Sequence, residues 1–133
     1  MSEKRNVVIK ANGGDVVVEV VVTNQKPAAI TVALYGADRR KEEDLGSALT
    51  LEPPDPDVFD IATSAKAASL NGKIIGVFVA IAAFDASVDQ PVSVVATLRQ
   101  DGQAIANGTV VDPAVVSQGG AGSIIGYVVT VLK

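Results

Sequence analysis

The sequence predicts an all-β fold: a single-domain antiparallel β-sandwich of about seven or eight strands, spanning residues 1–133. Two observations predict it. The apolar residues are chiefly valine, alanine and isoleucine, and stiff β-branched side chains favour pleated strands. Clusters of Gly, Pro, Asn and Asp break the apolar stretches at intervals of roughly ten to fifteen residues. This spacing is typical of an all-β sandwich or barrel. We expect a sandwich with an immunoglobulin-like or jelly-roll-like Greek key.

Turn residues divide the first half of the chain into short strands. The first three strands are expected at residues 6–11, 16–23 and 29–35. Residues 36–56 are mostly polar, and we expect one long connection there. A fourth strand is expected at 58–62. The following segment, 64–70, fits either a continuation of that strand or a short Ala-rich helical turn.

Two dipeptides in the second half indicate tight hairpins. Asn71-Gly72 and Asp101-Gly102 both suit a type I′ turn, which needs positive φ at both central residues. The remaining strands are expected at residues 73–84, 92–99, 103–111 and 124–132. Asn107-Gly108 interrupts the third of these and indicates a β-bulge. The Gly-rich stretch 112–122 is expected to form a loop.

Residues that carry chemistry are scarce. The chain has no cysteine and no histidine, which argues against disulfides, thiolate zinc sites, a Ser-His-Asp triad and a cysteine nucleophile. It has no tryptophan, and 4% of its residues are aromatic, so stacking sites for bases or sugars are not expected. A net charge of −4 argues against a nucleic-acid partner. We therefore expect no enzyme, with an acid-based hydrolase as the one catalytic alternative.

The apolar runs are too short for a membrane span. The longest, residues 74–84, falls well below the roughly 20 residues that a membrane helix needs. Lys10 and Asn12 interrupt the first apolar stretch, so it does not resemble a signal peptide. We expect a cytoplasmic protein, with secretion by a non-classical route as the open alternative.

Three predicted strands are apolar on both faces: 16–23, 73–84 and 124–132. A strand at the surface of a sandwich should instead alternate apolar and polar residues. Either residues 36–56 of the same chain cover the second face, or that face is a subunit interface, most simply about a two-fold axis. The sequence thus predicts a non-catalytic structural or binding protein that acts through homo-oligomeric assembly or protein–protein interaction.

Acidic residues concentrate in a few predicted loops. Strict alternation of strand direction places loops 12–15, 37–57, 85–90 and 112–122 at one acidic end of the sandwich. Ca²⁺ prefers several oxygen ligands from such loops. The candidate metal ligands are Asp55, Asp57, Asp60, Asp85 and Asp89. The alternative function is therefore a calcium-dependent module that binds a carbohydrate or another small ligand. No other cofactor is expected.

Overall fold

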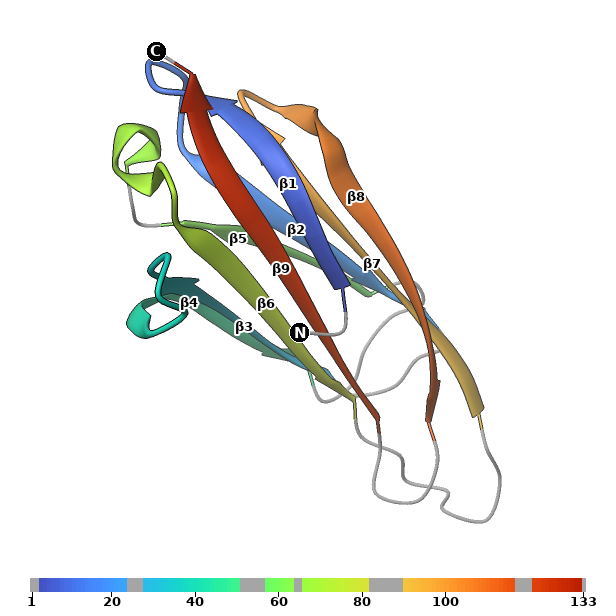
Figure 1. Ribbon diagram of the computed structural model, residues 1–133. Coiled ribbons are helices and arrows are strands. Elements are labelled where there is room, and N and C mark those ends of the chain that lie inside the picture. The colour runs from blue at the N-terminus through green and yellow to red at the C-terminus, as the bar shows by residue number, and fades with distance from the viewer. Residues whose placement is uncertain are drawn as a thin grey trace.

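The computed structural model describes residues 3–23, 28–50, 57–63, 66–81, 90–116 and 121–132, which form two β-sheets packed face to face (Figure 1). Within these residues there are nine strands: β1 (Glu3–Lys10), β2 (Val16–Val22), β3 (Ala28–Tyr35), β4 (Lys41–Thr50), β5 (Asp57–Ala62), β6 (Ile74–Ile81), β7 (Gln90–Gln100), β8 (Gln103–Val116) and β9 (Ala121–Leu132). The five-stranded sheet A has the order β1-β9-β6-β3-β4, and the four-stranded sheet B has the order β5-β2-β7-β8. The predicted all-β class is confirmed.

The strand count and the purely antiparallel arrangement were predicted wrongly. The polar segment expected to be a long connection contains β4, which forms an edge of sheet A. Leu45 and Ala48 of β4 face the core, while Lys41, Asp44 and Ser47 pair with outward-facing residues of β3. Register shifts in the β3–β4 ladder break the alternation, and an edge strand tolerates charge. Both effects remove the period-two signal of a strand.

The first and last strands run parallel to each other. β1 pairs with β9 from Glu3 opposite Ile125 to Lys10 opposite Leu132. Parallel neighbours cannot be joined by a tight turn, a limit that does not apply to strands so far apart along the chain. Every other strand pair is antiparallel within the described residues.

One predicted hairpin turn is confirmed and the other is wrong. Asp101 and Gly102 have φ values of 55° and 75°, as a type I′ turn between β7 and β8 requires. Asn71 instead has φ −59° and ψ 128°, and Gly72 has φ 76°, the values of a type II turn. This turn follows a 3-10 helix, η1 (Ala67–Leu70), and leads from sheet B into sheet A. The helical alternative for this segment is therefore correct.

The predicted bulge in β8 is present. Thr97 pairs with Thr109 but Arg99 pairs with Ala104, so residues 105–108 lie opposite Leu98. Asn107 adopts a φ of 64° there. β8 then continues to Val116 and β9 begins at Ala121, so much of the predicted loop at 112–122 is strand.

The core lies between the sheets and takes alternate residues from each strand. β2 contributes Val16, Val18, Val20 and Val22, and β6 contributes Ile75, Val77, Val79 and Ile81. Full burial of such a side chain stabilises the fold by roughly 1.5–3 kcal/mol. Tyr127 of β9 is fully buried among them, and its hydroxyl donates to the Gly108 carbonyl oxygen at 2.8 Å. Burial raises the pKa of this hydroxyl above its usual range.

Side chains close the gap between β1 and sheet B. The Gln100 side-chain amide donates to the carbonyl oxygens of Lys10 at 2.9 Å and Gly14 at 3.1 Å. Its side-chain carbonyl accepts from the Lys10 N–H at 2.9 Å. Further along β1, Asn107 donates to the Asn6 carbonyl oxygen at 3.0 Å and accepts from the Arg5 guanidinium at 3.2 Å. These amides replace the ladder bonds that a continuous sheet would supply.

The predicted acidic end is wrong, because the unforeseen strand β4 reverses the direction of each later strand. One end of the sandwich carries the described turns 11–15, 36–40, 66–73 and 101–102 (Figure 1). The paired strand ends Ala28, Thr50, Ile81 and Ala121 lie at the other end. Acidic and basic residues mix at the first end, where Lys73 pairs with Glu42 at 2.6 Å. No helix of the described residues has the length and hydropathy to span a membrane.

Candidate functional site: the outer face of sheet A

The outer face of sheet A, the side turned away from sheet B, is built from strands without charge. The three central strands β9, β6 and β3 contain no charged residue. Alternation with the core positions assigns these strands the following outer-face residues: Ala29, Thr31, Ala33 and Tyr35; Ile74, Gly76, Phe78 and Ala80; and Ile124, Gly126, Val128, Thr130 and Leu132. Leu132 is 62% exposed, and Val8 and Leu49 on the flanking strands are 54% and 66% exposed. A continuous, largely apolar face of this kind indicates an interaction surface.

Aromatic rings cover a glycine at the centre of this face. Gly76 lies opposite Gly126 in the β6–β9 ladder. A Cβ atom on Gly76 would meet Tyr35 Cε2 at 2.9 Å and Phe78 Cε2 at 3.1 Å, so both rings lie over the glycine. The ring centroids are 6.0 Å apart, with the planes tilted by 52°. Only a glycine at position 76 leaves room for both rings to pack against β6.

The rings bury neighbours that are not in the main core. Ala33 and Ile74 are 1% and 5% exposed, although both belong to the outer face and neither belongs to the core cluster. A small second layer therefore forms outside sheet A from Tyr35, Phe78, Ala33 and Ile74. This layer carries no charged side chain, and the Tyr35 hydroxyl is its one polar side-chain group.

The outer face of sheet B has a different character. Glu19 pairs with Arg99 at 3.4 Å across β2 and β7. Asp60 of β5 lies in register with Glu19 and is exposed. A row of valines crosses this sheet, formed by Val58, Val21, Val95 and Val111, but the charged row lies beside it. Only sheet A therefore presents a central face free of charge within the described residues.

The prediction of strands with two apolar faces is supported for β6 and β9. The alternative that residues 36–56 cover the second face is not supported by residues 36–50, because β4 extends sheet A at its edge. The interface alternative stays a proposal. The sequence did place Gly76 and Phe78 on one face through their spacing of two, but Tyr35 joins them only through the β3–β6 register.

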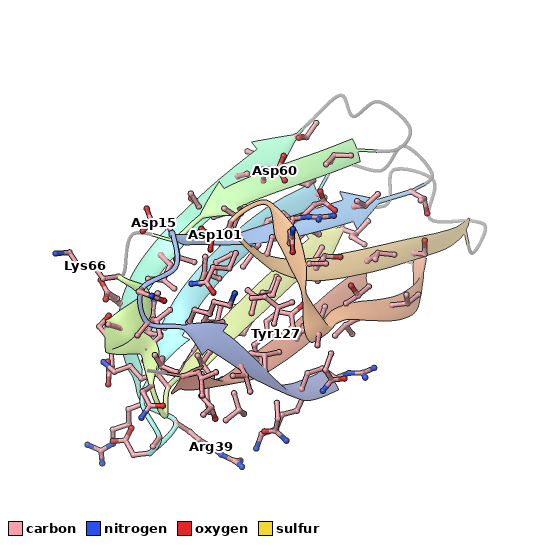
Figure 2. All side chains as sticks on the ribbon, turned by 90° about the horizontal axis from the view of Figure 1, so that it is seen from above. Asp15, Arg39, Asp60, Lys66, Asp101 and Tyr127 are labelled. Carbon is pink, nitrogen blue, oxygen red and sulfur yellow. The ribbon has the colours of Figure 1, made fainter. Side chains whose placement is uncertain are left out.

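The predicted calcium ligands cannot be assembled from the described residues. Asp60 lies on β5, well away from Tyr127 in the core (Figure 2). Asp57 begins β5 opposite Val22. The other three candidates, Asp55, Asp85 and Asp89, lie outside the described residues. No group of three acidic side chains that could hold a metal ion occurs in the part that the structure describes. The calcium hypothesis remains a prediction, tested by the change in melting temperature on adding millimolar Ca²⁺.

No protein-family model matches the chain, and no curated protein or solved structure matches it either. Function is therefore inferred from the chain's own surfaces.

Proposed function

We propose that this protein is a non-catalytic structural β-sandwich that works by assembling with further copies of itself through the outer face of sheet A. The observation that carries the proposal is the charge-free face of β9, β6 and β3, with Tyr35 and Phe78 lying over Gly76. The absence of histidine and cysteine from the sequence supports a non-catalytic role.

The size of the face suits a second copy. Strands lie about 4.8 Å apart and rise about 3.3 Å per residue. Five strands and eight paired residues therefore cover roughly 600 Å² per subunit, or about 1,200 Å² in a symmetric pair. This area is at the lower limit of a specific interface. The face of one sheet can pack on the face of another, and a second copy of the chain provides such a face.

We also propose that the strands of the sandwich follow an immunoglobulin-like or jelly-roll-like Greek key. It is supported by the connections, because all except β3–β4 and β7–β8 pass from one sheet to the other.

Sedimentation velocity with a matched pair of variants tests the assembly. Val128 of β9 and Val95 of β7 are both half-buried valines on outer faces, one on each sheet. Val128→Glu should convert an assembled protein at about 10 μM into a monomer, because a carboxylate cannot be buried unpaired in the interface. Val95→Glu should leave assembly unchanged.

Thermal unfolding of both variants measures whether each chain still folds. A wild-type chain that sediments as a monomer even at about 100 μM would refute the proposal. Equal loss of assembly in the two variants would show that the outer face of sheet A has no special part in it.

A further inference from the structure

One row of outer-face residues crosses sheet A from edge to edge. The strand pairing places in this row Lys4, Gly126, Gly76, Ala33 and Asp44. The three middle residues are the smallest amino acids, and the two end residues carry opposite charges. β6 is the central strand of five, so Lys4 and Asp44 each lie two strands from it, roughly 10 Å away. Lys4 and Asp44 therefore lie at about equal distances on either side of Gly76 and carry opposite charges.

A two-fold axis between two such sheets can run along the strands or across them. An axis parallel to β6 exchanges the two edges, so that β1 of one copy faces the partner's β4 in the same row. Lys4 then lies over the partner's Asp44, and the contact occurs twice. An axis across the strands would instead place β1 over the partner's β1, bringing together the exposed lysines Lys4 and Lys10 of both copies. Such like-charge contacts disfavour an interface.

We infer that two copies pair about a two-fold axis parallel to β6, with Lys4 of each copy beside the partner's Asp44. The inference rests on the proposed function, since it specifies how the same face is used. The axis then passes over Gly76, so the rings of Tyr35 and Phe78 that cover this glycine lie at the centre of the interface.

The Asp44 carboxylate, which would accept the hydrogen bond from the partner's lysine, is accessible from outside the sheet. A hollow of about 490 Å³ lies over β3 and β4, lined by Thr31, Ser47 and Asp44 among others. Asp44 already accepts from Lys41 at 2.7 Å, yet 63% of its side chain remains exposed. A lysine from a facing sheet can therefore enter the hollow and reach the carboxylate without displacing the existing pair. Thr31 and Ser47 offer hydroxyl oxygens to the other ammonium hydrogens.

Charge reversal in solution tests the orientation. Lys4→Glu and Asp44→Lys should each weaken the dimer roughly tenfold or more, because each places two like-charge contacts in the interface. The double variant Lys4→Glu/Asp44→Lys should restore the wild-type dissociation constant to within about threefold. Lys66→Glu and Asp60→Lys make the same charge changes at exposed positions away from the outer face of sheet A, and they should leave the dissociation constant unchanged.

Crosslinking gives a second readout because the chain has no cysteine of its own. Ala80 is exposed on β6, next to the inferred axis, whereas Thr109 is exposed on β8 of sheet B. With a thiol reagent that spans about 8–10 Å, Ala80→Cys should form a crosslinked dimer and Thr109→Cys should not. The expected span follows from sheets that pack about 10 Å apart.

The outcomes separate the inference from the proposed function. Rescue by the double variant together with crosslinking at Ala80→Cys supports the parallel axis. Assembly that Val128→Glu abolishes, but that ignores both charge reversals and gives no crosslink at position 80, overturns the axis and leaves the use of the face intact. A wild-type monomer overturns both.

Discussion

Gln100→Ala should lower the free energy of unfolding by about 2–3 kcal/mol. The side chain is 8% exposed and makes three hydrogen bonds at 2.9–3.1 Å, two with Lys10 and one with Gly14. Each such bond contributes about 0.5–1.5 kcal/mol net. Alanine leaves the Lys10 amide and carbonyl without these partners, although the exposed position of Lys10 lets water replace part of the loss. The expected loss therefore lies in the lower half of the additive range.

Chemical denaturation and thermal unfolding of the purified variant measure this loss. For a chain of 133 residues, an unfolding entropy of about 2.1 cal/mol/K per residue converts it into a fall of roughly 7–11 °C in Tm. Gln103→Ala is the matched control, because Gln103 pairs with Gln100 in the β7–β8 ladder but is exposed. The control should change stability by less than about 0.5 kcal/mol. If the two variants lose the same stability, the bonds to Lys10 and Gly14 do not hold this corner together.

Substitutions at three further positions test other parts of the fold. Asn107→Ala should lower the free energy of unfolding by about 2 kcal/mol, since it removes the bonds to Asn6 and Arg5 and strains a φ of 64°. Asn107→Gly should recover the part of this loss that comes from backbone strain. Denaturant titration of both variants measures the two free energies. Arg39→Gly should stabilise by up to about 1 kcal/mol because Arg39 is exposed at φ 65°; a lower Tm than wild type would contradict this. The raised pKa of Tyr127 means that the unfolded chain loses its proton first, near pH 10, so stability should hold below that pH and fall above it by up to about 1.4 kcal/mol per pH unit. Tyr127→Phe should reduce that slope in unfolding titrations between pH 9 and 11, and an unchanged slope would assign it to other groups.

Strands with a strong apolar pattern were predictable, whereas the polar edge strand was not. β2, β3, β6 and β9 match their predicted positions within a few residues because each buries alternate valines or isoleucines. β4 has only Leu45 and Ala48 packed on the core and begins with a run of charges. Its pairing partner, not its own composition, makes it a strand. That one omission reversed the predicted direction of each later strand.

Local turn chemistry was a partial guide. Asp101-Gly102 joins strands that are neighbours in one sheet, so the dipeptide sets the turn type. Asn71-Gly72 joins segments in different sheets, and there the Asn71 side chain accepts a hydrogen bond from the Val131 N–H at 2.9 Å. A tertiary contact thus fixed the conformation of Asn71 outside the positive-φ region.

The candidate site could be predicted only in part, because it too depends on contacts between distant segments. Two apolar faces on one strand indicate that something covers both, and this needs no knowledge of neighbours. The opposition of Lys4 and Asp44 depends on four successive ladders. A shift of one residue in any of them would turn one member to the other side of the sheet.

The parallel pairing of β1 with β9 also has a consequence for folding during synthesis. In sheet A, β1 pairs with β9, so residues 3–10 must wait for residues 125–132. At about 5–20 residues per second, translation separates the two segments by roughly 6–24 s. During that interval Val7 and Ile9, which end 2% and 1% exposed, cannot take their places in the finished sheet. The rest of the sandwich can collapse earlier, but closing this contact between the two ends of the described chain carries a large loop entropy. A chaperone that shields the first ten residues would therefore act where the delay is longest.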